Sequence, residues 1–292
     1  MADARAAAAV APPRGRRPAP LPLLVRQFRY QDLLFWRNPF SAFFTLVFPM
    51  MFLLLFNSLN GGSRLTELGG IRFAQFFTPG IMVFAVVSAT YVNLATSVPI
   101  NRDEGILKRL RGTPMPAWVY IAGRVVQATW AAVLASILMV AVGALLFHVK
   151  LFWHLMPAAT VTMLVGTVSF CALGLALAAV CPNGETAPAM ANFTWLPVAF
   201  ISPIFYSLEQ APQWLQTLGD IFPVKHFADA MRVAFNPSTV GYGFRWKDLA
   251  VIALWALGGA IVAVRKFQWE PRVASGGHRR GRRAGRIPAG GD

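Results

Sequence analysis

The sequence contains 292 residues, of which 56% are hydrophobic and only 13% are charged, and its formal net charge at pH 7 is +15. An ordinary soluble domain has about 25% charged residues. Several apolar runs here reach about 18 residues or more, which is the length of a transmembrane helix. The composition therefore excludes a soluble globular protein and predicts a chain that crosses a membrane several times. Neither Cys171 nor Cys181 has a CxxC or CxxH neighbour, so we expect no metal site and no disulfide framework.

The chain begins with a basic segment that is rich in Ala, Arg and Pro. Residues 1–21 lack the apolar core of a signal peptide, so we expect a disordered cytoplasmic tail. In residues 22–38, apolar side chains recur near helical spacing with Arg between them. This pattern predicts an amphipathic connecting helix that lies in the membrane interface. Asn38-Pro39 ends the helix, because the residue before a proline disfavours the α conformation.

Six apolar segments are expected to cross the membrane as α-helices, because about 20 residues at 1.5 Å per residue cover the roughly 30 Å hydrocarbon core. These predicted spans are residues 40–59, 76–98, 117–147, 155–180, 188–207 and 249–264. The fold class is therefore an all-α membrane protein with six transmembrane helices. Its membrane domain covers residues 39–268, and residues 269–292 form a second basic tail that we expect to be disordered.

Lys and Arg residues are concentrated on one side of this predicted topology. Seven precede residue 40, four lie in residues 101–116 and eight follow residue 264, which makes 19 of the 27 in the chain. The positive-inside rule places that side, with both termini, in the cytoplasm. Topology and attraction to anionic lipid head groups explain the basic charge, so nucleic acid is not expected as a partner.

The cytoplasmic segment "NRDEGILKRLRGTPMP", residues 101–116, separates two of the predicted spans. Acidic residues come first and basic residues last, an order that suits the dipole of a short helix. Ile106, Leu107 and Leu110 would form one apolar side of that helix. Two interpretations follow from the residues alone: a solvated loop whose charges fix the topology, or a docking helix for a cytoplasmic partner.

The same stretch resembles a short cytoplasmic motif of the ABC type-2 permeases, the membrane subunits of ATP-binding-cassette exporters. That motif reads approximately acidic-x-Gly-Thr-Leu-x-x-Leu-x-x-Thr-Pro. Ile106 stands where Thr is usual, and the matching residues are Glu104, Gly105, Leu107, Leu110, Thr113 and Pro114. "WRNPF" before the first span, "AGRVV" at 122–126 and the segment 196–232 also resemble the family in the same order. The resemblance covers about residues 20–268.

The resemblance implies that residues 101–114 contain a coupling helix that binds a P-loop ATPase, with a second contact in the turn "CPNGETA". The implied coupling residues are Arg102, Glu104, Gly105, Leu107, Lys108, Leu110, Arg111, Thr113, Pro114 and Glu185. It also implies two re-entrant helices at 208–233 on the outer side. The sequence has no GxxxxGK[ST] phosphate loop. We therefore expect ATP and Mg on the partner ATPase and no cofactor on this chain.

Permeases of this family pair with approximate two-fold symmetry, and the sequence leaves open whether the second subunit is a copy or a paralogue. An apolar substrate path is expected, because aromatic and Met side chains adapt to varied hydrophobic molecules. Its candidate residues are Phe44, Phe48, Met51, Asn93, Phe193, Trp195 and Phe200. The expected function is export of a hydrophobic or amphipathic substrate, which could be a drug, an antibiotic or a lipid, across a bacterial plasma membrane.

Two alternatives stay open at this point. The first is an exporter of lipid-linked glycan, which the sequence does not distinguish from a drug or lipid exporter. The second belongs to another class and is a stand-alone ion-coupled transporter. No Asp, Glu or His lies in the middle of a predicted span, and such a transporter would normally need one to relay protons.

Overall fold

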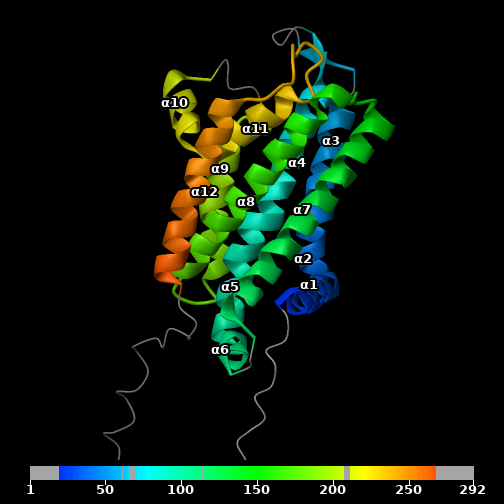
Figure 1. Ribbon diagram of the computed structural model, residues 1–292. Helices are drawn as coiled ribbons and strands as arrows, with labels where there is room; N and C mark the ends of the chain where they lie inside the picture. The colour runs from blue at the N-terminus through cyan, green and yellow to red at the C-terminus, as the bar shows by residue number, and fades with distance from the viewer. Residues whose placement is uncertain (1–19, 61, 66–69, 113–114, 207–210, 268–292) are drawn as a thin grey trace, which may run out of the picture.

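The computed structural model describes residues 20–60, 62–65, 70–112, 115–206 and 211–267, and the chain is predominantly helical (Figure 1). Its long helices lie side by side in one bundle, with α6 at one end and α10 and the short strands at the other. The elements before α7 are α1 (Pro20–Arg37), α2 (Pro39–Ala42), the π-helical turn η1 (Phe43–Val47), α3 (Phe48–Leu59), the antiparallel strands β1 (Arg64–Leu65) and β2 (Ile71–Arg72), α4 (Phe73–Val87), the π-helical turn η3 (Ser88–Val92), α5 (Asn93–Asp103) and α6 (Ile106–Arg111).

The second half of the described chain is also helical. Its elements are α7 (Ala117–Phe147), the 3-10 turn η4 (Trp153–Leu155), α8 (Met156–Val180), α9 (Ala187–Ile201), α10 (Gln213–Ile221), α11 (Pro223–Val233) and α12 (Trp246–Lys266). The predicted all-α class is therefore confirmed for the part of the chain that the structure describes.

Five helical stretches are long and apolar enough to cross a membrane, by length and composition, within the described ranges. They are Pro39–Leu59, Phe73–Asp103, Trp118–Phe147, Trp153–Val180 and Trp246–Lys266. These five correspond to the first, second, third, fourth and sixth predicted spans. The first two contain the π-helical turns η1 and η3, which the apolar pattern did not predict.

The fifth predicted span, residues 188–207, corresponds to the shorter helix α9. This helix ends at Ile201 after 15 residues, six residues before the predicted boundary. Ser202 has an extended backbone (φ −87°, ψ 155°), as expected for a residue that precedes a proline. At 1.5 Å per residue, α9 is roughly 22 Å long, which is less than the roughly 30 Å hydrocarbon core.

The predicted connecting helix corresponds to α1, which lies against α7 near the α6 end of the bundle (Figure 1). The two helices approach closely at Gly123 of α7. A Cβ at this position would lie only 2.5 Å from Cγ of Gln27. After α1 ends, Oδ1 of Asn38 accepts a hydrogen bond from the backbone N–H of Ser41 at 3.2 Å and caps α2.

α8 packs closely on its neighbours at glycine positions. A Cβ at Gly174 of α8 would lie 2.7 Å from the backbone oxygen of Tyr91 in η3. A Cβ at Gly259 of α12 would lie 3.0 Å from the carbonyl carbon of Ala172 in α8. Small residues let transmembrane helices pack backbone against backbone. α8 therefore joins α12 to the second spanning stretch of the bundle.

Polar contacts tie α11 to its neighbours at the end of the bundle opposite α6. Nδ1 of His226 lies 2.7 Å from Oδ1 of Asp248 in the first turn of α12. The guanidinium of Arg232 lies 4.0 Å from the ring centroid of Phe76 in α4. The predicted re-entrant pair at 208–233 corresponds to α10 and α11, and residues 207–210 lie outside the described part of the chain.

Candidate functional site

The charged segment between α5 and α7 contains the short helix α6, which projects from the end of the bundle (Figure 1). Gly105 separates α5 from α6 and has a positive φ of 72°, in the left-handed region that favours glycine. Its backbone N–H donates to the carbonyl of Arg102 at 3.1 Å, and that of Glu104 donates to the carbonyl of Ile100 at 3.0 Å. The glycine that follows the acidic residue of the motif therefore makes the sharp change of direction into α6.

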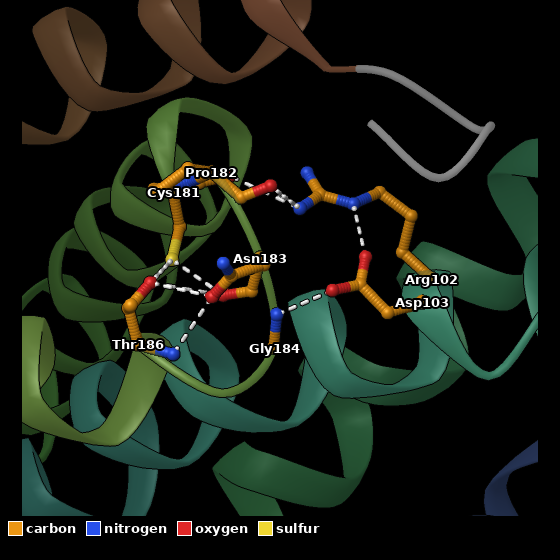
Figure 2. Close-up of polar contacts among 7 residues, drawn as sticks. All are labelled: Arg102, Asp103, Cys181, Pro182, Asn183, Gly184 and Thr186. Atoms are coloured by element: carbon orange, nitrogen blue, oxygen red, sulfur yellow. Dashed lines mark hydrogen bonds and ion pairs between the residues drawn. The ribbon is translucent and has the colours of Figure 1, made fainter. Parts of the chain in front are cut away.

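Arg102 and Asp103 attach the end of α5 to the turn between α8 and α9 (Figure 2). Arg102 is only 2% exposed, and its Nη2 donates to the carbonyls of Cys181 and Pro182, both at 3.0 Å. Its Nε donates to Oδ1 of Asp103 at 3.2 Å. The other carboxylate oxygen of Asp103 accepts the backbone N–H of Gly184 at 2.5 Å. We call this set of contacts the Arg102–Asp103 clamp.

The turn held by the clamp is closely packed and leads directly into α9. A Cβ at Gly184 would lie 2.7 Å from Cα of Ile100, so the turn rests on the backbone of α5. Oδ1 of Asn183 accepts hydrogen bonds from the backbone N–H and the hydroxyl of Thr186, at 2.9 and 2.8 Å. The Arg102–Asp103 clamp therefore connects α5 with both α8 and α9, next to the base of α6.

The structure places three of the predicted coupling residues on the surface at this end of the bundle. Glu104, Lys108 and Glu185 are exposed, and Gly105 and Leu110 are half-buried. Thr113 and Pro114 lie outside the described residues, as does the side chain of Arg111. The exposed residues carry both signs of charge and are free to meet a partner surface of mixed charge.

Two predicted contact residues are buried. Leu107 is 0% exposed and Arg102 is 2% exposed, so neither side chain can touch a partner in this conformation. Leu107 lies on the apolar side of α6, which faces the chain itself, and Arg102 satisfies backbone carbonyls of the neighbouring turn. In this conformation the two side chains contact this chain itself, and their predicted contact with the ATPase stays a prediction.

Asp103 was missed by the sequence reasoning, although a signal for it was present. Adjacent residues of opposite charge end an apolar span at Arg102 and Asp103. Charged groups at the edge of the membrane core are costly unless they are paired or hydrogen-bonded. A pair in this position therefore predicts partners in the fold, but the sequence does not say that the partners are in the turn after α8.

Aromatic rings join several of the residues predicted for the substrate path. The ring centroids of Phe44 and Phe48 are 5.6 Å apart, and those of Phe48 and Phe84 are 6.4 Å apart. Phe84 of α4 then lies 5.4 Å from Trp195 of α9. Phe205 lies 5.7 Å from Phe84 and 5.2 Å from Phe200. The aromatic residues of the first span and of α9 are thus connected through Phe84, which the sequence reasoning did not select.

The predicted path residues do not all face one cavity. Phe44, Met51, Phe193 and Phe200 are each more than half exposed on the surface of the bundle. Phe48 and Asn93 are half-buried, and Trp195 is 3% exposed. We call the exposed part of this set, which is Phe44 of η1, Met51 of α3 and Phe193 and Phe200 of α9, the aromatic surface.

The chain is similar to known transport proteins. A family model described as ABC-2 type transporter matches residues 23–236. Inner membrane transport permease YadH of Escherichia coli (strain K12) is 26% identical over 194 residues, which cover 65% of this chain and 75% of YadH. Daunorubicin resistance ABC transporter permease protein DrrB1 of Streptomyces coeruleorubidus is 29% identical over 195 residues, 66% of this chain and 68% of DrrB1. Because the family model matches well over half of the chain, this protein belongs to the ABC-2 type transporter family.

Proposed function

We propose that this chain is the permease subunit of an ATP-driven exporter and that a separate P-loop ATPase binds it at α6. ATP and Mg are then bound by the ATPase, and this chain contributes no nucleotide site. The observation that carries the proposal is the Arg102–Asp103 clamp beside an exposed, charged α6. If α6 only fixed the topology, the end of α5 next to it would not need to be joined to the turn between α8 and α9.

The clamp provides a rigid path from the ATPase to the membrane. A displacement of α6 acts on the end of α5 at Gly105, and the clamp transfers it to the turn that starts α9. Side-chain hydrogen bonds to charged groups are among the stronger polar contacts in proteins. If the ATPase binds two arrangements of this end of the bundle with different affinities, its binding shifts the membrane helices between two states.

The proposed topology has six crossings, with α9 as the fifth. An even number of crossings places both basic ends of the chain on one side, which the positive-inside rule makes the cytoplasm of a bacterial cell. α6 then faces the cytoplasm, and α10 and α11 lie on the outer side as a re-entrant pair that follows the short α9. α1 lies in the cytoplasmic interface of the plasma membrane.

The proposed substrate is hydrophobic or amphipathic. The aromatic surface supports this, because it presents large apolar side chains from the two helices that a second permease subunit would cover. Two relatives, DrrB1 and the probable multidrug ABC transporter permease YbhR of Escherichia coli (strain K12), are named for daunorubicin resistance and for multidrug transport. A drug-like molecule or a lipid is therefore the substrate class that we propose, and a copy or paralogue of this chain completes the path.

A pull-down from native membranes tests the role of α6. We expect a P-loop ATPase to copurify with the wild-type chain in mild detergent and to be lost from the Glu104→Arg variant, because Glu104 is exposed and its charge is reversed. Lys247→Glu is the matched control, since it reverses an exposed charge at the opposite end of the bundle. Equal recovery of the ATPase with both variants would contradict the proposed docking site at α6.

A further inference from the structure

A groove with a volume of about 300 Å³ lies between α9 and α12, with α8 as its floor. α12 packs along α8, whereas α9 packs against α5, η3 and α10, and the space between α9 and α12 is left open. The floor extends from Phe170 to Val180 of α8. Ten residues of α-helix rise roughly 15 Å, so the groove is elongated and runs parallel to the helices.

The wall of the groove is almost entirely apolar. Its two hydroxyl groups are satisfied within the wall: the hydroxyl of Tyr91 lies 2.7 Å from Oγ1 of Thr194. Thr194 in turn donates to the carbonyl of Met190 at 2.8 Å. Nε1 of Trp195, a lining residue, has no hydrogen-bond partner among the described residues, but it has less than 1 Å² of exposed surface, so an occupant does not reach it. An occupant therefore needs no polar groups at this depth, and its long axis lies along the helices. A single hydrocarbon chain has both properties.

The two ends of the groove differ. At the end near α10, Nε1 of Trp255 donates to the carbonyl of Ile221 at 3.0 Å, and its ring stacks on Phe222 with centroids 6.5 Å apart. These contacts close that end. At the end near α6, Val180 and Val262 line the groove and are 41% and 40% exposed, so the groove is open there.

Positive charge lies beside the open end. Arg265 and Lys266 are exposed in the last turn of α12, three and four residues after Val262. Residues at these spacings share one face of a helix, so both cations follow the groove wall. The combination of an apolar, closed-ended groove and two cations at its mouth is complementary to a molecule with a hydrocarbon tail and an anionic head.

We propose that this groove binds one acyl chain of an anionic phospholipid, whose head group lies at Arg265 and Lys266. On the orientation proposed above, the lipid belongs to the cytoplasmic leaflet, and its chain reaches toward the stacked Trp255 and Phe222. The site is separate from the aromatic surface and from α6. Because α9 forms one wall, an occupied groove favours the position of α9 that is seen here.

Photochemical labelling of the purified full-length chain tests the site. The protein is placed in phosphatidylcholine nanodiscs that contain a small fraction of phosphatidylglycerol with a diazirine in its acyl chain. After irradiation, labelled peptides are identified by mass spectrometry. We expect labels concentrated on the groove-lining parts of α8, α9 and α12, with competition by unlabelled phosphatidylglycerol and not by extra phosphatidylcholine.

Two pairs of variants separate the site from general lipid contact. Val262→Trp fills the mouth of the groove, and Leu257→Trp is its control because Leu257 is exposed on another face of α12. Lys266→Gln removes a cation at the mouth, and Lys247→Gln removes one at the opposite end of the same helix. We expect Lys266→Gln to lower groove labelling about fivefold, which corresponds to about 1 kcal/mol per basic residue near an anionic surface. Val262→Trp should lower it at least as much, and the two controls should leave it unchanged.

The proposal is overturned if labels are spread evenly over the lipid-facing helices, if diazirine phosphatidylcholine labels the groove equally well, or if each variant matches its control. A groove that binds acyl chains of neutral lipids would give the second of these results. Should Val262→Trp fail to fold, the lysine pair decides the question alone. Labelling needs no ATPase, so its failure is distinct from a failure of the pull-down at α6.

Discussion

Arg102 shows how the chain keeps a charge at the boundary of a spanning helix. A buried cation is costly unless its hydrogen bonds are satisfied and its charge is compensated. Here the guanidinium meets two carbonyls and the carboxylate of Asp103. The planar fork of arginine suits this arrangement, because it donates in several fixed directions at once.

The clamp leads to a first prediction at this scale. Arg102→Ala removes three hydrogen bonds of a charged donor and leaves Asp103 without its cation. We expect the free energy of unfolding to fall by about 2–3 kcal/mol. For a chain of this size the melting temperature in detergent should then fall by roughly 5–10 °C. Arg109→Ala removes an exposed arginine from α6 and should change the free energy by less than about 0.5 kcal/mol. Equal effects of the two variants would contradict the clamp.

At the scale of helices, the contact between α8 and α12 depends on which of two adjacent glycines faces the partner. A Cβ at Gly259 would lie 3.0 Å from backbone atoms of Ala172 and Leu173, whereas a Cβ at Gly258 has no atom within 4 Å. Backbone atoms cannot rotate away as a side chain can. A side chain at position 259 therefore needs the two helices to move apart by a few tenths of an ångström.

We predict that Gly259→Ala lowers the free energy of unfolding by about 1–3 kcal/mol, as other overpacked cores do. Gly258→Ala should be neutral or should stabilise the helix by up to about 1 kcal/mol, because alanine favours helix over glycine. Thermal unfolding of both variants under the same detergent conditions measures the difference. A loss of stability in both would show that helix flexibility, and not close packing, is the reason for this glycine pair.

The elements that the sequence predicts well are those whose limits are set by local chemistry. α7 begins and ends at residues 117 and 147 as predicted, because an apolar run lies between proline and a charged loop. The prediction extended the fifth span to residue 207 because apolar residues continue past Ser202. In the structure α9 ends at Ile201, because Ser202 precedes Pro203 and has an extended backbone. The partners of the clamp lie in a distant part of the chain, so the local charge pair at Arg102 and Asp103 indicates that partners exist but does not identify them.

At the scale of the whole molecule, exposed apolar side chains lie on two surfaces: the aromatic surface, which we expect to face a second subunit, and the surface of α12, which we expect to face lipid. On α2, η1 and α3 the exposed residues Phe40, Phe44 and Met51 recur at helical spacing, and on α9 Phe193 and Phe200 do the same. Phe84 connects these helices, so they border one region of the bundle. In a symmetric pair of subunits, the same surface is used by both partners. The aromatic surface is the proposed position of the second subunit.

Cysteine cross-linking in native membranes tests this assembly. Phe193→Cys places a thiol on α9 where the side chain is 81% exposed, and Leu257→Cys places one on α12 where it is 59% exposed. Both native cysteines are buried, so they can be kept. We expect a bismaleimide to link two chains through position 193 and not through position 257, since α12 faces lipid in the proposed pair.

Dimers linked mainly through position 257 would place the interface at α12 and contradict the proposed pair. Monomers with both variants would mean that this surface does not bind a second copy, and a paralogue would then be required to complete the exporter.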